Sequence, residues 1–220
     1  MITNNLTTPL NQDRSNQATV IARKLLQNEF ICPISDRPNF DWLKNADNYQ
    51  FLDERLAIFG LKLVQYADGD VITAVNIAPT EEDRKKVVKQ FDETINQLQP
   101  MIELLIGLTH ADDKGETLYM GRIIQQDKLV LAVNQNKAFE SSLHKLMAKD
   151  KSFGKPNDQQ IDALLTKMRQ DKLLQLTNPM QKVYQVTGKI EYINRLIAFI
   201  SENYLEKEPE TLPEQQGLGI

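Results

Sequence analysis

The chain has 220 residues, 41% of them hydrophobic and 25% charged, which is typical of a globular protein with one or two small domains. Its 26 basic and 30 acidic side chains give a net charge of −4, which argues against a stand-alone DNA-binding protein because such proteins neutralise phosphates with Lys and Arg. A signal peptide and a membrane-spanning run are both missing from the sequence, and the single cysteine, Cys32, rules out an internal disulfide. We therefore expect a cytoplasmic protein.

Both ends of the chain are polar and carry no hydrophobic periodicity. Residues 1–17 have neither apolar spacing nor a helix signal, and the segment 205–220 holds four glutamates against one lysine together with prolines and glycines. Such a composition is typical of disorder. The sequence thus predicts a disordered N-terminus over 1–17, a disordered tail over 205–220, and a folded part between them.

A first folded unit is predicted over residues 18–78. Helical spacing joins Ala18, Ile21, Ala22 and Leu25, "FICP" at 30–33 indicates a short strand ended by proline, and a short helix covers 40–43. A further helix, capped by Asn48, carries Leu52, Leu56 and Phe59 on one side and ends at Gly60. In "LKLVQYADGDVITAV", the dipeptide Asp68-Gly69 favours a type I′ hairpin because both of its central positions need positive φ.

A linker helix is predicted over residues 79–99. Thr80 is its cap, and three acids follow at the positive end of the helix dipole. An apolar stripe runs along it through Val87, Phe91, Ile95, Leu98, Ile102 and Leu105, with a break or kink at Pro100. The stripe either packs on the two units or contacts another chain; for the second case Phe91 and Leu98 are the candidate interface residues, because large apolar anchors dominate protein interfaces.

A second unit is predicted over residues 100–204. It begins with a helix at 101–109, continues through the strand "LYMGRI" and two helices, and reaches "NDQQIDALLTKMRQDKLLQLTNPMQKVYQVT" at 157–187. There, Asn157 and Gln160 have capping-box spacing before an apolar helix face, and a two-stranded hairpin with its turn at 177–180 follows. A closing helix starts at Lys189.

The two units share one general order of elements, which is helix, short strand, further helices and hairpin, although they differ in detail. Their residue-by-residue similarity is weak, so this shared order is the basis for the fold prediction. We predict a mainly α protein with small β-hairpin wings (α+β), in which two tandem winged-helix domains are joined by a helical linker.

Catalytic chemistry is not indicated by the sequence. His110 beside Asp112 and Asp113 is a weak metal signal in a loop, His144 lies in a helix between apolar residues, and Cys32 sits in an apolar run typical of a structural thiol. No glycine-rich phosphate loop is found in the sequence. We therefore predict no catalytic residues, no cofactor and no metal site.

A possible nucleic-acid surface remains on the second hairpin unit. Lys167, Arg169, Lys172 and Lys182 follow its helix and wing and are candidate contacts to the DNA backbone. Between 158 and 172, however, three basic residues are balanced by three aspartates. The four residues form either a solvated face or a backbone contact inside a larger assembly.

The whole arrangement resembles a known family. The segments "ARKLLQNEFICPISDRPNFDWL", "FLDERLAIFGLKLVQYADGDVITAV" and the second unit from "PMIELLIGL" to "GKIEYI" are similar to the tandem winged-helix subunits that bind the kleisin of bacterial SMC complexes. Within that class, the sequence looks most like MksE, the MukE-like subunit of Muk/Mks-type condensins. The likeness covers about residues 18–200 and rests on order, spacing and hydrophobic texture.

The resemblance implies a non-catalytic role. Such a subunit dimerises, binds a kleisin (MksF-like), and through it joins an SMC ATPase (MksB-like), with DNA held inside the assembled complex. It would be cytoplasmic and nucleoid-associated, and would serve chromosome organisation and segregation or defence against plasmids. The alternative is a homodimeric winged-helix transcription regulator, which predicts tight, salt-sensitive binding of one DNA sequence by the isolated protein.

Overall fold

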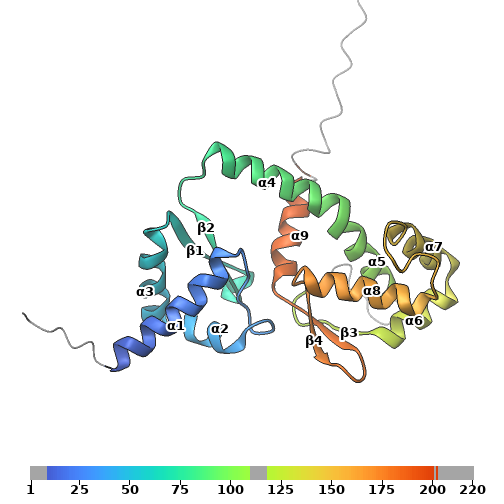
Figure 1. The fold of residues 1–220 in the computed structure, drawn as a ribbon, viewed down its shortest axis with the longest axis horizontal. Coiled ribbons are helices and arrows are strands. Elements are labelled where there is room, and N and C mark those ends of the chain that lie inside the picture. Colours follow the sequence, from blue (N-terminus) through green and yellow to red (C-terminus); the bar gives the residue numbers. More distant parts are fainter. Residues whose placement is uncertain (1–8, 110–117, 201, 203–220) are drawn as a thin grey trace, which may run out of the picture.

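The computed structural model describes residues 9–109, 118–200 and 202, and within them the protein is mainly helical with two small antiparallel sheets (Figure 1). The N-terminal half consists of α1 (Pro9–Leu26), α2 (Arg37–Leu43), α3 (Ala46–Ala57) and the hairpin of β1 (Leu61–Tyr66) and β2 (Val71–Asn76). The C-terminal half consists of α5 (Gln99–Thr109), β3 (Ile123–Gln125), α6 (Gln126–Gln135), α7 (Lys137–Leu146), α8 (Asn157–Gln170), β4 (Leu174–Asn178), β5 (Val183–Val186) and α9 (Lys189–Ile200). In Figure 1, α4 (Glu81–Glu93) passes along one side of the molecule between the halves.

Helix α1 begins earlier than the sequence suggested. It starts at Pro9, so residues 9–17 are helical and the predicted disorder does not apply to them, whereas residues 1–8 lie outside the described residues. Tertiary contacts explain the difference: the Arg14 guanidinium lies 4.3 Å from the centre of the Phe51 ring and donates a hydrogen bond to the Asp47 carbonyl. These contacts to α3 favour the helical state of a polar segment that has little apolar surface of its own.

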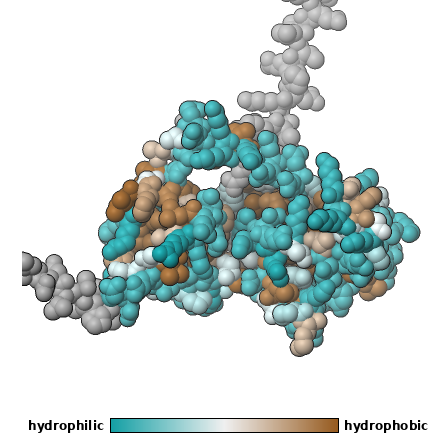
Figure 2. Space-filling model, viewed as in Figure 1, coloured by the Kyte–Doolittle hydropathy of each residue, from teal (hydrophilic) through white to brown (hydrophobic). Residues whose placement is uncertain are grey.

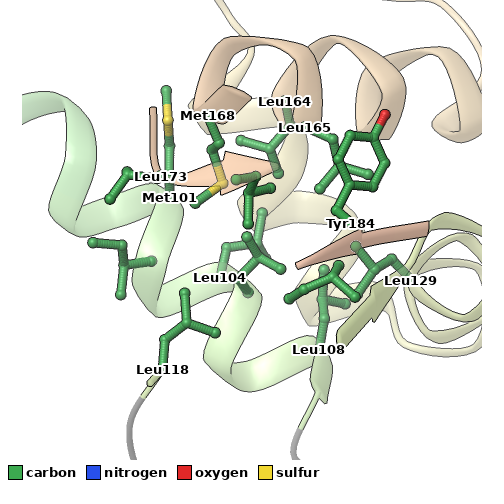
Figure 3. Packing of buried hydrophobic residues seen from close by; sticks show 14 of the residues in the cluster. Met101, Leu104, Leu108, Leu118, Leu129, Leu164, Leu165, Met168, Leu173 and Tyr184 are labelled. Carbon is green, nitrogen blue, oxygen red and sulfur yellow. The ribbon is translucent and has the colours of Figure 1, made fainter. Parts of the chain in front are cut away.

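Each half has its own buried apolar cluster. The N-terminal cluster is formed by α1, α2, α3 and the hairpin, with side chains such as Ile21, Leu25, Leu52, Leu56 and Ile72 almost completely buried. The C-terminal cluster is larger; Figure 3 shows its side chains from α5, α8 and β5 meeting in one layer, among them Met101, Leu104, Leu164, Leu165, Met168 and Tyr184. The predicted apolar stripes of α1 and α8 are therefore confirmed as core-facing.

The two sheets are built alike. After α1, Ile31 forms an isolated antiparallel bridge with Ile72 of β2, the second strand of the first hairpin. After α5, β3 pairs antiparallel with β5, the second strand of the second hairpin, which gives the order β3-β5-β4. In both halves, a short stretch that follows a helix pairs with the second strand of a later hairpin. In the first half this pairing is a single bridge at Ile31. Pro33 follows two residues later and has no N–H with which to extend the pairing.

The first hairpin turn differs from the prediction. Tyr66 pairs with Val71, so four residues rather than two close the loop, and Ala67, Asp68 and Gly69 all have positive φ. The prediction of a two-residue type I′ turn is therefore wrong. The long-range pairing decides the register, because it places Val71 and Ile72 in buried positions at the start of β2.

Two helices have N-caps that differ from those predicted from the sequence. Asn45 rather than Asn48 caps α3, since its side-chain oxygen accepts from the Asp47 and Asn48 amides. At α8 the N-cap position is Pro156, and the Gln160 side chain donates to the Lys155 carbonyl at 2.7 Å instead of completing a capping box. At α4 the predicted cap is confirmed, because Thr80 Oγ1 accepts from the Asp83 amide and the Asp83 carboxylate accepts from the Thr80 amide.

The linker continues into the C-terminal half without a break. A π-helical turn, η2 (Thr94–Leu98), joins α4 to α5, and Pro100 is the second residue of α5. Figure 1 shows the helical path bending between α4 and α5. The kink foreseen at Pro100 is thus present as a local widening of the helix, which accommodates a residue that has no backbone N–H to donate.

Candidate interaction surfaces

The residues weighed for catalysis or metal binding do not assemble into a site within the described part of the chain. Cys32 is fully buried, and His144 Nε2 lies 3.2 Å from Asn157 Oδ1. No group of three or more His, Cys, Asp or Glu side chains placed to hold a metal is found among the described residues, and His110, Asp112 and Asp113 lie outside them. A helix that combines the length and the apolar character needed to cross a bilayer was not found among the described residues either.

One of the four basic residues predicted on α8 and its hairpin is ion-paired within the chain. Arg169, Lys172 and Lys182 are exposed and Lys167 is half-buried. Lys182 Nζ lies 2.5 Å from Asp162 Oδ1 of α8, and this hydrogen bond holds the pKa of Lys182 above its ordinary value. Asp162 therefore neutralises one of the four candidate DNA contacts.

The second hairpin presents an apolar tip. Its loop lies between β4 and β5, where Met180 is 94% exposed and Lys182 adopts a positive φ of 48°. The Asn178 side chain closes the loop by accepting from the Gln181 amide at 3.1 Å. The hydrogen-bonded loop thus exposes the large apolar side chain of Met180 to solvent, close in sequence to the ion-paired Lys182.

The two predicted interface residues of the linker already contact other parts of this chain. Leu98 packs against the C-terminal cluster. Phe91 is half-buried, and its ring centre lies 6.1 Å from that of Phe199 in α9, in an edge-on arrangement. Val87 and Val88 of the same helix remain exposed, so the first two turns of α4 keep an apolar surface open while the later part of the stripe packs on the C-terminal half.

A second apolar surface lies where α3 runs into β1, and the sequence did not indicate it. Ile58 is 81% exposed, Phe59 67% and Ile77 52%, and the Ile77 amide donates to the Gly60 carbonyl at 2.8 Å, which brings these side chains to one corner. We call these three residues the apolar corner; Figure 2 shows brown, apolar residues gathered over this end of the molecule. The sequence placed Phe59 on the same side of a helix as Leu52 and Leu56, both of which are buried. However, α3 ends at Ala57 and Gly60 has a φ of +72°, so the chain turns before Phe59 can face the core.

The two halves meet at a small joint. The Gly188 amide donates to Cys32 Sγ at 3.2 Å, and a Cβ on Gly188 would lie 2.6 Å from Val71 Cγ2 and 2.9 Å from Cys32 Cβ. Beside this contact the Tyr192 ring lies 5.1 Å from Phe30 and 6.1 Å from Tyr66, measured between ring centres. We call these residues the Cys32–Gly188 joint. Cys32 has no access to solvent there, so its thiol has a packing role.

A groove, which we call the α7 groove, lies on the C-terminal half along α7 and the turn that follows it. The groove has a volume of about 510 Å³ and is lined by Lys137, Glu140, His144, Lys145, Ala148 and Phe153, with Ser141 beside them. Phe153 is 56% exposed at its edge. The sequence signal for this surface is the run "KLMAKDKSFGK" at 145–155, with four lysines against one aspartate.

A scan against protein-family models and a search of curated proteins gave no match for this sequence. The described residues form two small helical halves, each with a hairpin, and they carry several exposed apolar or basic surfaces.

Proposed function

We propose that this protein is a non-catalytic accessory subunit of a bacterial SMC complex of the condensin type, built from two tandem winged-helix domains and related to MksE. It would bind a kleisin subunit and, through the kleisin, an SMC ATPase. Its work would be chromosome organisation and segregation or defence against plasmids, on the nucleoid.

The winged-helix part of the proposal is supported by a similar order of elements in the two halves. In each half a helix is followed by a short β segment, two or three helices and a hairpin, and the short segment pairs antiparallel with the second hairpin strand. This is the order of elements in a winged helix, with the hairpin as its wing. Two such units joined by a helix agree with the resemblance of the sequence to the kleisin-binding subunits.

The surfaces support binding to proteins more than independent reading of DNA. Asp162 neutralises Lys182 beside the wing, and the chain as a whole carries a net charge of −4. Exposed apolar side chains occur on the wing tip at Met180, at the apolar corner and on the first turns of α4. Contiguous exposed apolar surface is typical of protein contacts, and weak DNA affinity suffices in a complex that holds its subunits at high effective concentration.

The experiment that tests the proposal is a tagged purification from the native cell at moderate salt, with the co-purifying proteins identified by mass spectrometry. Recovery of a kleisin together with a large coiled-coil ATPase would support it. If the protein instead purifies alone and then binds one DNA sequence tightly, with affinity falling steeply as salt rises, the homodimeric transcription regulator takes its place.

The linker residues give this test a control. Phe91 and Leu98 remain the proposed partner contacts of the linker, together with the exposed Val87 and Val88, although Leu98 is already engaged in the C-terminal cluster. Purification with a Val88→Asp variant, which alters only an exposed position, separates partner contact from folding.

A further inference from the structure

We infer that the α7 groove binds an acidic peptide segment of another protein, one that carries a large apolar side chain between its carboxylates. This site is distinct from the α8 hairpin residues and from the linker, and the inference does not depend on which complex the protein joins.

The segment that contains α7 and the following turn is basic. Between residues 137 and 155 the sequence carries five lysines against two acidic residues, within a chain that is acidic overall. Lys145, Lys149, Lys151 and Lys155 are all exposed, and none of them forms an ion pair with another described residue. Lys145 lines the groove, and the other three lysines are close in sequence to its lining residues Ala148 and Phe153. A solvated face on this protein would be expected to mix both signs, so a segment with four unpaired lysines at this groove favours an anionic occupant.

The two acidic side chains of this segment form hydrogen bonds within the chain. The Asp150 carboxylate accepts from the Ser152 amide at 2.8 Å and from the Ser152 hydroxyl at 2.7 Å, which closes the turn after α7. Glu140 accepts from Lys137 Nζ at 2.8 Å and from Asn157 Nδ2 at 3.1 Å. Both carboxylates thus serve the local structure, and the lysines of the turn remain available to a ligand.

The α7 groove also has an apolar part. Ala148 and Phe153 line it, and the Phe153 ring stands more than half exposed beside the lysines. A hollow of about 510 Å³ can accept one or two side chains of a bound peptide. Contacts to a DNA backbone would use the lysines alone and leave the exposed ring and the hollow without a role, whereas an acidic peptide with an apolar anchor uses both.

The geometry also holds the groove in shape. Asn157 Nδ2 donates to Asn134 at 2.9 Å and to Glu140, and Asn157 Oδ1 faces His144 Nε2, so the start of α8 is tied to both α6 and α7. Leu143 and Met147 anchor the inner face of α7 and its end in the C-terminal cluster. A rigid groove lowers the entropic cost of ordering a bound segment.

The test uses the full chain and three fluorescein-labelled probes in anisotropy titrations at low and moderate salt. The first probe is a synthetic peptide of alternating Glu and Ser with one central Phe, the second replaces that Phe with Ser at equal charge, and the third is a duplex DNA of arbitrary sequence. The inference predicts that the first peptide binds about tenfold or more tightly than the second, because a buried aromatic anchor dominates such contacts.

Three variants locate the site. The variant K149E/K151E/K155E is expected to bind the first peptide about tenfold or more weakly than wild type. The variant F153S is expected to bind the first peptide only as weakly as wild type binds the second peptide. K85E/K86E/K89E on α4 is the matched control, since it changes the net charge equally at exposed positions and is expected to leave binding unchanged. Circular dichroism and thermal unfolding check that each variant folds, and amide NMR shifts on adding the first peptide should map to α7 and residues 147–156.

Other outcomes would overturn the inference. Duplex DNA that binds with the same dependence on the three lysines and is indifferent to F153S would make the surface a nucleic-acid contact. Self-association that disappears in the lysine variant would make the occupant a second copy of the chain. Equal binding of all probes to wild type and to the lysine variant would leave only a solvated face.

Discussion

Gly188 and Cys32 are 156 residues apart in sequence, yet the Gly188 amide donates a hydrogen bond to Cys32 Sγ at 3.2 Å. Gly188 lies between β5 and α9, and Cys32 lies between α1 and α2, so this bond connects the two halves of the molecule. A side chain at position 188 would overlap Val71 and Cys32. The absence of a Cβ is what allows the halves to approach this closely.

The first prediction concerns this joint. Gly188→Ala is expected to lower the free energy of unfolding by about 1–3 kcal/mol, because the added methyl group overpacks a buried contact. Urea denaturation followed by circular dichroism measures the change. A second readout is the rate at which Cys32, fully buried in the native state, is alkylated, and we expect this rate to rise in the variant as the joint opens.

A compensating change serves as the control. In the double variant V71A/G188A the Val71 Cγ2 atom that the new Cβ would meet at 2.6 Å is removed, so part of the lost stability should return relative to the sum of the single variants. Strictly additive losses would show that the joint is not the cause of the destabilisation.

The second prediction concerns pH. Burial opposes ionisation of Asp36, but hydrogen bonds from Lys24 and Asn39 outweigh it, so the pKa of Asp36 in the folded protein is below its ordinary value. A carboxyl with a lowered folded-state pKa contributes stability that is complete above its unfolded pKa of about 3.9. That contribution is lost as the pH falls from there through the folded-state pKa.

Asp36→Asn isolates the effect, because Asp36 is the N-cap of α2 and asparagine caps equally well. At pH 7 the unfolding free energy of the variant should be lower by about 1 kcal/mol. The expected loss is this small because Lys24 is partly exposed and solvent screens its interaction with Asp36. The difference from wild type should shrink as the pH falls below about 4. Thermal melts between neutral and acid pH measure it, and a difference that stays constant with pH would contradict the prediction.

The third prediction compares two apolar side chains of opposite burial. Leu165→Ala, at a fully buried position of the C-terminal cluster, should cost about 2–5 kcal/mol of unfolding free energy. Ile58→Ala, at an 81% exposed position of the apolar corner, should change it by less than about 0.5 kcal/mol. Denaturant titrations of both variants test whether the apolar corner is a solvent-exposed surface that does not contribute to stability. A large loss of unfolding free energy in Ile58→Ala would contradict this.

The fourth prediction concerns the wing. Asp162→Asn removes the ion-pair partner of Lys182 and should raise any affinity for duplex DNA, with the salt dependence steeper by about one phosphate contact. Lys182→Ala should have the opposite effect. Anisotropy titrations over a range of salt concentrations distinguish them. Identical salt slopes in wild type and both variants would remove Lys182 from the candidate DNA contacts.

The fifth prediction concerns the linker. Phe91→Asp should reduce recovery of the proposed kleisin partner, because the ring is half-buried and lies beside Phe199 on a surface that continues into exposed apolar residues. The variant must be compared with Phe91→Leu, which keeps an apolar side chain. Partner recovery that is unchanged in a folded Phe91→Asp protein would exclude this residue from the interface.

Several elements could be read from the sequence because their causes are local. The spacing of Ile21 and Leu25 in α1, and of Ile161, Leu164, Leu165 and Met168 in α8, predicted which faces are buried, since helical periodicity alone places such residues on one side. The cap at Thr80 was also predictable, because Thr80 and Asp83 are only three residues apart. The mainly helical character with small antiparallel hairpins followed from the same kind of signal.

The tertiary structure decided the features that depend on distant partners. Whether Lys182 is an available cation depends on Asp162, twenty residues earlier; whether Gly188 matters depends on Cys32 and Val71 in the other half; and whether residues 9–17 are ordered depends on contacts to α3. The exposure of Phe59 depends on where the chain leaves α3. Periodicity and propensity describe the chain one segment at a time, whereas charge pairing and close packing are set by which segments the fold brings together.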